Sequence, residues 1–529
     1  MKRPIRLVKT GLRIIPFLII CYASSGYAQE TDVTQTPNAI NAGIQKSLQD
    51  QIGAGRGDIN TPQSSLYIIN RDPFRSIRRG RQLFQRKFTI AQGFGPRTGD
   101  GRGNIEADDS IGAGLADSCA ACHGRPKGSA GFGGDVFTRP DSRDAPHLFG
   151  LGLIEMLADE ITQELRSIKN SASARAQETG QNIRVRLQSK GISYGFIRAL
   201  PDGSVDTSNV TGVNGDLRVR PFLHHGGKIS IREFVVGAFN AEMGLEAFDP
   251  DLAKASAGGK ITTPSGMVLD GALDTIEVSP ASSTSDDPDL DGVANEIPVS
   301  LVDHMEFYLL NYFKPAVHRA NSRVRSGRKI FQQIRCTGCH IPSLVIERDR
   351  RVADVETKHN AQKGSFNQLF AAATPLIQPT PNSGNPPVKK PMEKRFIVNN
   401  IFADFKRHNL GPNFWERNFD GTITKEFMTE PLWGVGSSAP YGHDGRSVNL
   451  WSVIMRHGGE AQSSRNRFAR MSAAQQALLM EFLQSLVLFP PDNTASNLNP
   501  KNPRAANYPQ NGHGSIALPK FFNDPSDLE

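Results

Sequence analysis

A five-residue stretch occurs twice in the chain, as Cys119-Ala120-Ala121-Cys122-His123 and as Cys336-Thr337-Gly338-Cys339-His340. Two cysteines three positions apart can each form a thioether with one edge of a porphyrin, and the histidine that follows can bind the iron. A single match could also be a redox dithiol or half of a zinc site. Two copies favour two covalently bound haem c groups, with zinc held by two Cys2His sets as the alternative.

The fifth cysteine agrees with this interpretation. The chain has 5 cysteines, and Cys21, which is outside the two motifs, lies in a segment that we expect to be removed. The mature chain then has no thiol left for a disulfide, although disulfides are common in exported proteins. All of its thiols are therefore predicted to be used in haem attachment.

Residues 1–28 have the features of a secretory signal peptide. Basic residues precede the apolar run 14–20, and Gly26-Tyr27-Ala28 offers small residues for cleavage. The run is too short to span a bilayer comfortably, so a retained anchor is the weaker alternative. Lipidation of Cys21 is also less favoured, because the preceding Ile20 is large. We expect a periplasmic protein that is not an integral membrane protein once the signal is cleaved.

The composition is that of a globular protein with enough residues for two cores. Of the 529 residues, 38% are hydrophobic and 22% are charged. The formal net charge of +8 includes five basic residues and no acid within 1–28, so the remainder has 56 basic and 53 acidic residues, or +3. This charge does not indicate nucleic-acid binding.

The same helical pattern precedes each haem motif, and this repeat defines the expected architecture. Gly80-Arg81-Gln82-Leu83-Phe84-Gln85 returns as Gly327-Arg328-Lys329-Ile330-Phe331-Gln332. The expected fold class is mainly α, with two cytochrome-c-like haem domains related by this repeat and a small β-like insertion in the first. The expected divisions are the signal peptide, an N-terminal arm over 29–72, a first domain over 73–314, a second over 315–490, and a C-terminal tail over 491–529.

Periodicity and turn residues predict the elements of these domains. Helices are expected from near Pro73, over 148–166 and 229–239, on the apolar face of 301–312, and after Ser472 as N-cap. Strands are expected over 192–199 and 217–222, and a Pro-rich loop over 374–391.

Five further motifs give the chain a resemblance to a known family. They occupy 145–155, 238–244, 431–436, 439–446 and 457–461, and the most specific is Ala439-Pro440-Tyr441-Gly442-His443-Asp444-Gly445. Together with the haem motifs they make residues 75–490 resemble the di-haem oxidoreductase family, within the bacterial dihaem cytochrome c peroxidase superfamily. The resemblance implies that one haem reacts with hydrogen peroxide and that the other passes electrons to it from a small redox protein.

The resemblance also implies the iron ligands. His123 and His340 match the proximal ligands. The distal ligand of the second haem falls at or near His457, with Met455 as the alternative, and His457 packing beneath the helix end is a third interpretation. Two histidine ligands would give a lower potential than histidine with methionine. His443 is expected to be a structural or propionate contact.

Glu242 matches the acidic residue on the distal side of the peroxide-binding haem. Its implied role is general acid–base catalysis, in which it moves a proton from one oxygen of bound peroxide to the departing oxygen. Asn240 is a candidate hydrogen-bond donor beside it. The alternative is an ordinary carboxylate near a helix end.

The chain departs from the family pattern in two places. The peroxidases have a tryptophan between the haems, but the matching stretch 222–228 contains His224 and His225 and no tryptophan. The loop 128–140 has no histidine either. The first haem is therefore expected to be open, or bound by His147 or His225.

Asp287, Asp289 and Asp291 alternate in a sequence that ends in Gly292 and is followed by Asn295 and Glu296. These hard oxygen ligands resemble the start of an EF-hand loop, which this chain does not complete with a glutamate at the twelfth position. Calcium binding and a solvated acidic loop remain the two interpretations.

These observations predict a periplasmic dihaem c-type oxidoreductase that reduces hydrogen peroxide at the first haem with electrons relayed through the second. One alternative is an enzyme that oxidises a partner protein or an organic substrate through high-valent iron. Another is a pure electron-transfer cytochrome, in which both haems are six-coordinate.

Overall fold

The computed structural model describes residues 51–86, 88, 118–124, 135–136, 143–288, 292–312, 320–359, 369–418 and 420–486. The predicted signal peptide, the predicted C-terminal tail over 491–529 and the proposed boundary near 314 lie outside these ranges, as do Asp289 and Asp291. Within the described ranges, no helix combines the length and the apolar character needed to cross a membrane.

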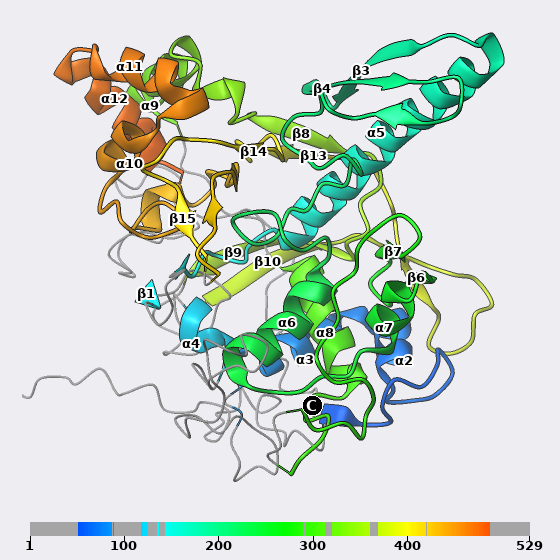
Figure 1. The fold of residues 1–529 in the computed structure, drawn as a ribbon. Coiled ribbons are helices and arrows are strands. Elements are labelled where there is room, and N and C mark those ends of the chain that lie inside the picture. The colour runs from blue at the N-terminus through cyan, green and yellow to red at the C-terminus, as the bar shows by residue number, and fades with distance from the viewer. Residues whose placement is uncertain are drawn as a thin grey trace, which may run out of the picture.

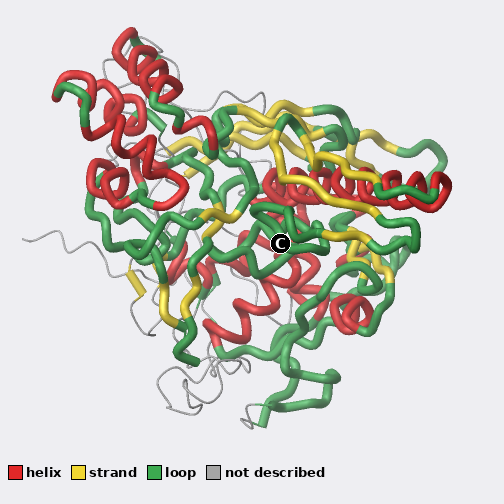
Figure 2. Tube along the Cα trace, turned by 45° about the horizontal axis from the view of Figure 1, so that its top comes forward, coloured by secondary structure: helices red, strands yellow, loops and turns green. Residues whose placement is uncertain are grey.

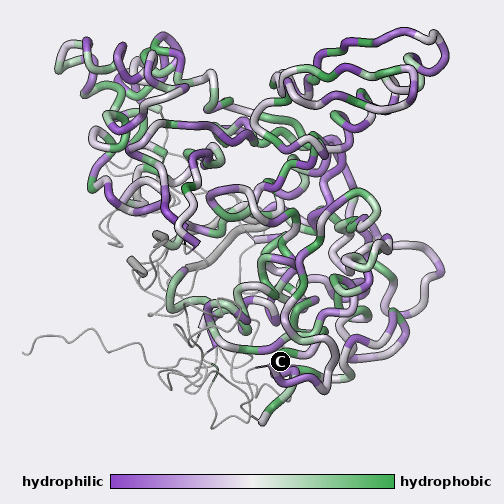
Figure 3. The backbone as a smooth tube through the Cα atoms, viewed as in Figure 1, coloured by the Kyte–Doolittle hydropathy of each residue, from purple (hydrophilic) through white to green (hydrophobic). Residues whose placement is uncertain are grey.

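Two pairs of crossing helices carry the two copies of the sequence repeat (Figure 1). The first pair is α3 (Pro73–Gln85) with α8 (Val299–Asn311), and the second is α9 (Ser322–Gln333) with α12 (Ala473–Gln484). The described chain mixes hydrophobic and hydrophilic residues along its length (Figure 3), and α8 is buried from Ser300 to Asn311 although this stretch includes Asp303, His304 and Glu306. The helices predicted at Pro73, over 301–312 and after Ser472 are thereby confirmed.

The repeated glycine lies where the helices of each pair cross. A Cβ atom on Gly80 would lie 2.3 Å from the carbonyl oxygen of His304, and one on Gly327 would lie 2.0 Å from that of Leu478. Both distances are far below van der Waals contact, so no side chain fits at either crossing. Close helix packing therefore explains why the glycine recurs in both copies.

Gly327→Val is expected to lower the free energy of unfolding by about 1–3 kcal/mol, because the added side chain forces α9 away from α12. Denaturant unfolding of the haem-loaded protein measures the effect. Lys329→Ala, at an exposed position of the same helix, serves as the control and should change stability by less than about 0.5 kcal/mol. Equal stability of the two variants would show that the crossing tolerates a side chain.

The long helix α5 (Leu151–Thr179) and the strands β3 (Ile183–Ser189), β4 (Ile192–Ala199) and β5 (Val205–Asp206) form a projecting unit (Figures 1 and 2). The helix begins three residues later than predicted and continues thirteen residues further. α6 (Ile231–Met243) confirms the helix predicted over 229–239, and its N-cap Ser230 forms a capping box with Glu233.

The strand predicted over 217–222 was wrong. The partner of β4 is β3, and the two strands are joined by Lys190 and Gly191, both with positive φ, as a tight hairpin turn requires. The segment 217–222 instead packs on α5, where the backbone N–H of Val219 donates to the hydroxyl of Thr162.

The described strands form seven two-stranded sheets and one three-stranded sheet, so the content is mixed rather than mainly α, with more helix than strand. Part of the predicted loop 374–391 is a hairpin of β11 and β12.

The other helical elements are α2 (Ser65–Arg71), α4 (Cys119–His123), α7 (Pro250–Ser256), η3 (Cys336–Gly338), η6 (Val435–Ser437), α10 (Leu450–Arg456), η7 (Gly459–Ala461) and α11 (Gln462–Ala469). The other strands are β1 (Asp135–Val136), β2 (Arg143–Asp144), β6 (Lys260–Thr262), β7 (Val268–Asp270), β8 (Ser343–Ile346), β9 (Ala353–His359), β10 (Leu369–Pro375), β11 (Ile377–Pro379), β12 (Lys389–Pro391), β13 (Phe396–Asn399), β14 (Arg407–His408), β15 (Glu416–Arg417), β16 (Ile423–Thr424) and β17 (Phe427–Met428).

Two hydrophobic clusters form the interior of the described residues. The first surrounds α3, α5, α6 and α8, and the second, smaller cluster lies between α9 and α12. In the second cluster, the rings of Phe331, Phe402 and Phe482 contact one another edge to face. Each cluster thus contains one of the two helix crossings.

Candidate functional site

Both Cys-x-x-Cys-His motifs line one cavity of about 1440 Å³. Such a volume exceeds the range of about 300–1,000 Å³ that is typical of a pocket for one small ligand. The two motifs lie 217 positions apart in sequence (336 minus 119), yet the fold brings them to the same interior space. The cavity therefore has room for more than one large group.

The two motif histidines have matching hydrogen bonds. Nδ1 of His123 donates to the carbonyl oxygen of Pro146 at 2.8 Å, and Nδ1 of His340 donates to that of Phe402 at 2.9 Å. In each ring Nε2 is then the nitrogen that can bind a metal. Burial lowers the pKa of both rings, that of His123 to about 4. Both imidazoles are therefore neutral at pH 7, the state in which they bind iron.

The phenylalanine of the repeat lies beside each of these histidines. The ring centroids of Phe84 and His123 are 6.5 Å apart at 52°, and those of Phe331 and His340 are 6.1 Å apart at 48°. The repeat thus places the same ring against the same ligand twice, and the two sites are built alike.

His457 lies at the C-cap of α10 and lines the cavity. Its Nδ1 donates to the carbonyl oxygen of Val453 at 2.7 Å, which again leaves Nε2 for a metal. Burial lowers its pKa to about 4, and the charge of nearby His340 acts in the same direction. Met455 instead packs against the second hydrophobic cluster. His457 therefore presents a ring nitrogen to the cavity, and its role as the distal ligand stays a prediction, with Met455 as the alternative.

Backbone hydrogen bonds hold the loop after His457 against residues 409 and 410. The backbone N–H of Gly458 donates to Leu410 at 2.9 Å, and that of Glu460 donates to Asn409 at 3.0 Å. A Cβ on Gly459 would lie 2.1 Å from the carbonyl oxygen of Asn409. The His-Gly-Gly-Glu motif therefore fixes the position of the histidine ring.

The Ala-Pro-Tyr-Gly-His-Asp-Gly motif forms a turn against α10. The carboxylate of Asp444 accepts two hydrogen bonds from Arg456, at 3.1 and 2.7 Å. Burial raises the pKa of Asp444, but these bonds outweigh it and bring the pKa down to about 2. His443 stacks on Phe427 with centroids 3.9 Å apart, so it has a packing role, and its contact with a propionate stays a prediction.

α6 brings Glu242 and Asn240 to the part of the cavity that contains the first motif. Burial raises the pKa of Cys122, and the charge of Glu242 raises it further, which shows that these two side chains are close. Next along α6, Sδ of Met243 lies 4.0 Å from Sγ of Cys119. The predicted catalytic carboxylate is therefore beside the first attachment site.

The other candidate histidines also line the cavity. Nε2 of His147 donates to the carbonyl oxygen of Trp433 at 3.0 Å, and Nδ1 of His224 lies 2.9 Å from the carboxylate of Glu430. His225 is the third. Glu430 was not predicted, because it belongs to no motif that marks it as functional.

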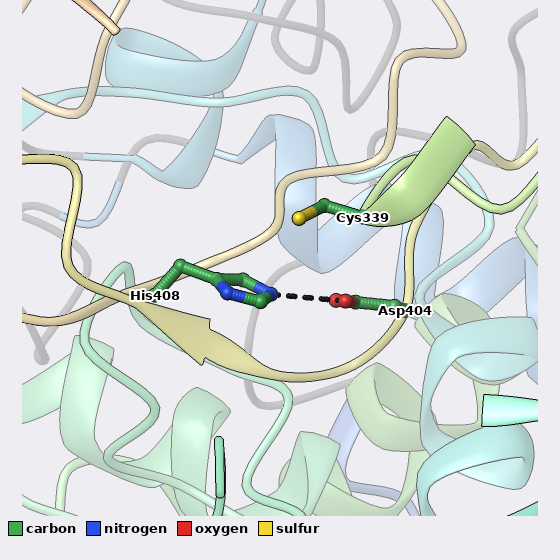
Figure 4. A group of neighbouring side chains, drawn as sticks. All are labelled: Cys339, Asp404 and His408. Atoms are coloured by element: carbon green, nitrogen blue, oxygen red, sulfur yellow. Dashed lines mark hydrogen bonds and ion pairs between the residues drawn. The ribbon is translucent and has the colours of Figure 1, made fainter. Parts of the chain in front are cut away.

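A second group missed from the sequence surrounds Cys339 (Figure 4). The imidazole of His408 contacts Asp404 through Nε2 at 2.9 Å and Glu460 through Nδ1 at 2.8 Å. Burial lowers the pKa of His408, but Asp404 and Cys339 raise it, to about 11. Both ring nitrogens of His408 interact with carboxylates, so neither is free to bind a metal. We therefore describe this group as a set of ion pairs that packs beside the second motif and not as a metal site.

The proposed calcium loop is only partly described. Asp287 accepts a hydrogen bond from the backbone N–H of Gly292 at 3.0 Å. Asn295 accepts one from Phe248 at 3.0 Å, and Glu296 accepts one from Glu246 at 2.7 Å. These bonds shape the loop, and calcium binding stays a prediction.

Two buried donors provide a test of whether haem suits the cavity. Nε1 of Trp433 and Nε of Arg465 both belong to lining residues and have no hydrogen-bond partner within the described part of the chain. Buried donors normally have acceptors, and haem carries two carboxylates. The donors, the four cysteines and the neutral histidines together fit this group.

Comparison with known proteins agrees with this chemistry. The model of the family described as "Di-haem oxidoreductase, putative peroxidase" matches residues 350–486. No curated protein matches the chain. The matched segment includes His408, the Asp444 turn and His457, which surround the second motif. Residues 350–486 are therefore similar to the di-haem oxidoreductase family, the family that the sequence motifs indicate.

Proposed function

We propose that the protein is a periplasmic dihaem c-type oxidoreductase. It reduces hydrogen peroxide at the first haem site, with electrons that a small redox protein delivers through the second. The observation that carries the proposal is the shared cavity, in which two Cys-x-x-Cys-His motifs of matching geometry lie together and the charge of Glu242 acts on Cys122 of the first. The two helix crossings then belong to two cytochrome-c-like domains.

When bound, the haem groups supply one-electron redox chemistry and, at the first site, an iron that accepts peroxide. The cysteine pairs would hold them covalently, and His123 and His340 would offer Nε2 to the irons. His457 would offer a further imidazole nitrogen at the second site, which suits that site to electron transfer rather than to substrate binding.

Glu242 handles protons at the first site. Reduction of one hydrogen peroxide to two waters consumes two electrons and two protons. The Glu242 carboxylate accepts the proton of the near oxygen and returns it to the departing oxygen, which leaves as water. Asn240, on the same turn of α6, orients the peroxide by hydrogen bonding.

Steady-state assays on the purified dihaem protein test the proposal. A reduced small cytochrome should sustain peroxide consumption, and the ferric protein should contain a high-spin haem whose absorption and EPR spectra respond to peroxide. Two low-spin haems that peroxide leaves unchanged, before and after partial reduction, would leave only electron transfer. Turnover that requires an added protein or organic substrate would favour the oxidation of that substrate instead.

His457→Met is expected to raise the reduction potential of the second haem, by part of the roughly 0.8 V range that axial ligands span. Spectroelectrochemical titration measures the shift. Met455→Leu is the matched control and should leave the potential unchanged, because Met455 packs in the second cluster. The opposite pattern would identify Met455 as the ligand.

A further inference from the structure

The dipeptide of Leu432 and Trp433 links the two hydrophobic clusters. Leu432 packs against the second cluster, which contains α9 and α12. Trp433 is 3% exposed and belongs to the first cluster, although it comes from the second half of the chain. Both residues line the cavity. The chain therefore passes from one haem site to the other within two residues.

On the side of Leu432, the backbone leads to the second motif. The N–H of Leu432 donates to the carbonyl oxygen of Ile401 at 3.0 Å. The carbonyl oxygen of the next residue, Phe402, accepts the hydrogen bond from Nδ1 of His340 at 2.9 Å. Leu432 is thus connected to the second proximal histidine through one backbone dipeptide.

On the side of Trp433, the connection leads to the first motif. The carbonyl oxygen of Trp433 accepts from Nε2 of His147 at 3.0 Å. The residue before His147 is Pro146, whose carbonyl oxygen accepts from Nδ1 of His123 at 2.8 Å. On each side of residues 432–433, two hydrogen bonds and one dipeptide therefore lead to a motif histidine.

We infer that this path is the electronic connection between the two haem sites. It joins the two proximal histidines through four hydrogen bonds and three dipeptides, 401–402, 432–433 and 146–147, without a gap. The inference rests on the proposed function, in which the reduced second haem is the reductant and the first haem site is the oxidant. One electron passes, no bond is made or broken, and every proton stays on its nitrogen.

His147 supplies the one side chain of the path besides the two ligands, so it is the link that substitution can remove. The indole of Trp433 is not part of the path, because the carbonyl oxygen makes the contact. The structure thus separates a route through the backbone of Trp433 from a route through its ring.

The experiment compares His147→Leu, which removes the donor, with His147→Gln, which keeps an N–H donor of similar reach. Pulse radiolysis delivers one electron to the dihaem protein, and absorption follows its passage between the haems without peroxide. His147→Leu should slow this passage by an order of magnitude or more, whereas His147→Gln should stay close to the wild-type rate. Haem content, spin state and both potentials should be unchanged in the two His147 variants.

An unchanged rate in His147→Leu would overturn the inference, as would a slow rate confined to Trp433→Phe. A changed spin state of the first haem in the His147 variants would also overturn it, because His147 would then act on the iron. If His147→Leu fails to load both haems, His147→Phe offers a larger ring without the donor. Since no peroxide is used, this result is independent of whether the protein is a peroxidase.

Discussion

Glu242→Gln is expected to lower kcat for hydrogen-peroxide reduction by about 10²–10⁴-fold, the usual contribution of a positioned acid–base group. Glutamine has nearly the same shape as glutamate, so the packing of α6 beside Cys119 and Cys122 is retained. Its amide cannot accept a proton from peroxide and return it. The loss should therefore appear in turnover, while haem content and the spectra of the ferric protein stay the same.

Stopped-flow and steady-state peroxide assays measure this effect. Glu178→Gln removes the same charge at the exposed end of α5 and is the matched control, with turnover close to wild type. Wild-type turnover in Glu242→Gln would assign the proton to water or to another cavity group. Glu242 would then be an ordinary carboxylate near a helix end.

Arg232→Met is expected to lower the free energy of unfolding by about 3–5 kcal/mol, the cost of breaking a buried ion pair on one side. The guanidinium of Arg232 is fully buried and lies 2.6 Å from Asp249, 3.0 Å from Asp303 and 2.7 Å from Glu306. Without it, Asp303 keeps its ion pair with Arg56, whereas Glu306 keeps a hydrogen bond from the Thr263 hydroxyl and Asp249 keeps hydrogen bonds from backbone N–H groups. A loss of this size is a large part of a typical stability of about 5–15 kcal/mol.

Chemical denaturation of the haem-loaded protein, monitored by circular dichroism, measures this loss. Arg323→Met breaks the exposed pair with Glu481 and should cost less than about 1 kcal/mol. If the two variants were equally stable, the buried carboxylates would have to be protonated in the native protein. Stability of Arg232→Met would then fall with rising pH, because the unfolded chain would release protons that the native protein retains.

The two candidate haem sites could be located in the sequence because the chemistry is local. Two thiols and an imidazole act together only at fixed spacing, so Cys119 and His123, and likewise Cys336 and His340, are identified by the motif alone. The helix after Ser472 was predictable for the same reason, since its capping residue and apolar positions lie within a few turns.

The contacts that position these motifs in the fold could not be predicted from spacing. His408 contacts Cys339, and His147 contacts Trp433, across long separations in sequence that only the folded chain brings together. Spacing carries no signal for such contacts. The wrong prediction of a strand over 217–222 has a related cause. The alternating apolar residues of this segment match a strand pattern, but its backbone is hydrogen-bonded to the side chain of Thr162 on α5 and not to a neighbouring strand.

The hydrogen bonds of the two motif histidines close chain segments of different length, and this has a consequence for folding. His123 donates to a carbonyl group 23 residues later in the chain, whereas His340 donates to one 62 residues later. The longer loop costs only about 1 kcal/mol more in closure entropy, but its carbonyl group emerges later during N-terminus-first synthesis. The ring of His123 can therefore reach its final orientation before that of His340, so the half of the chain that contains His123 is expected to fold first.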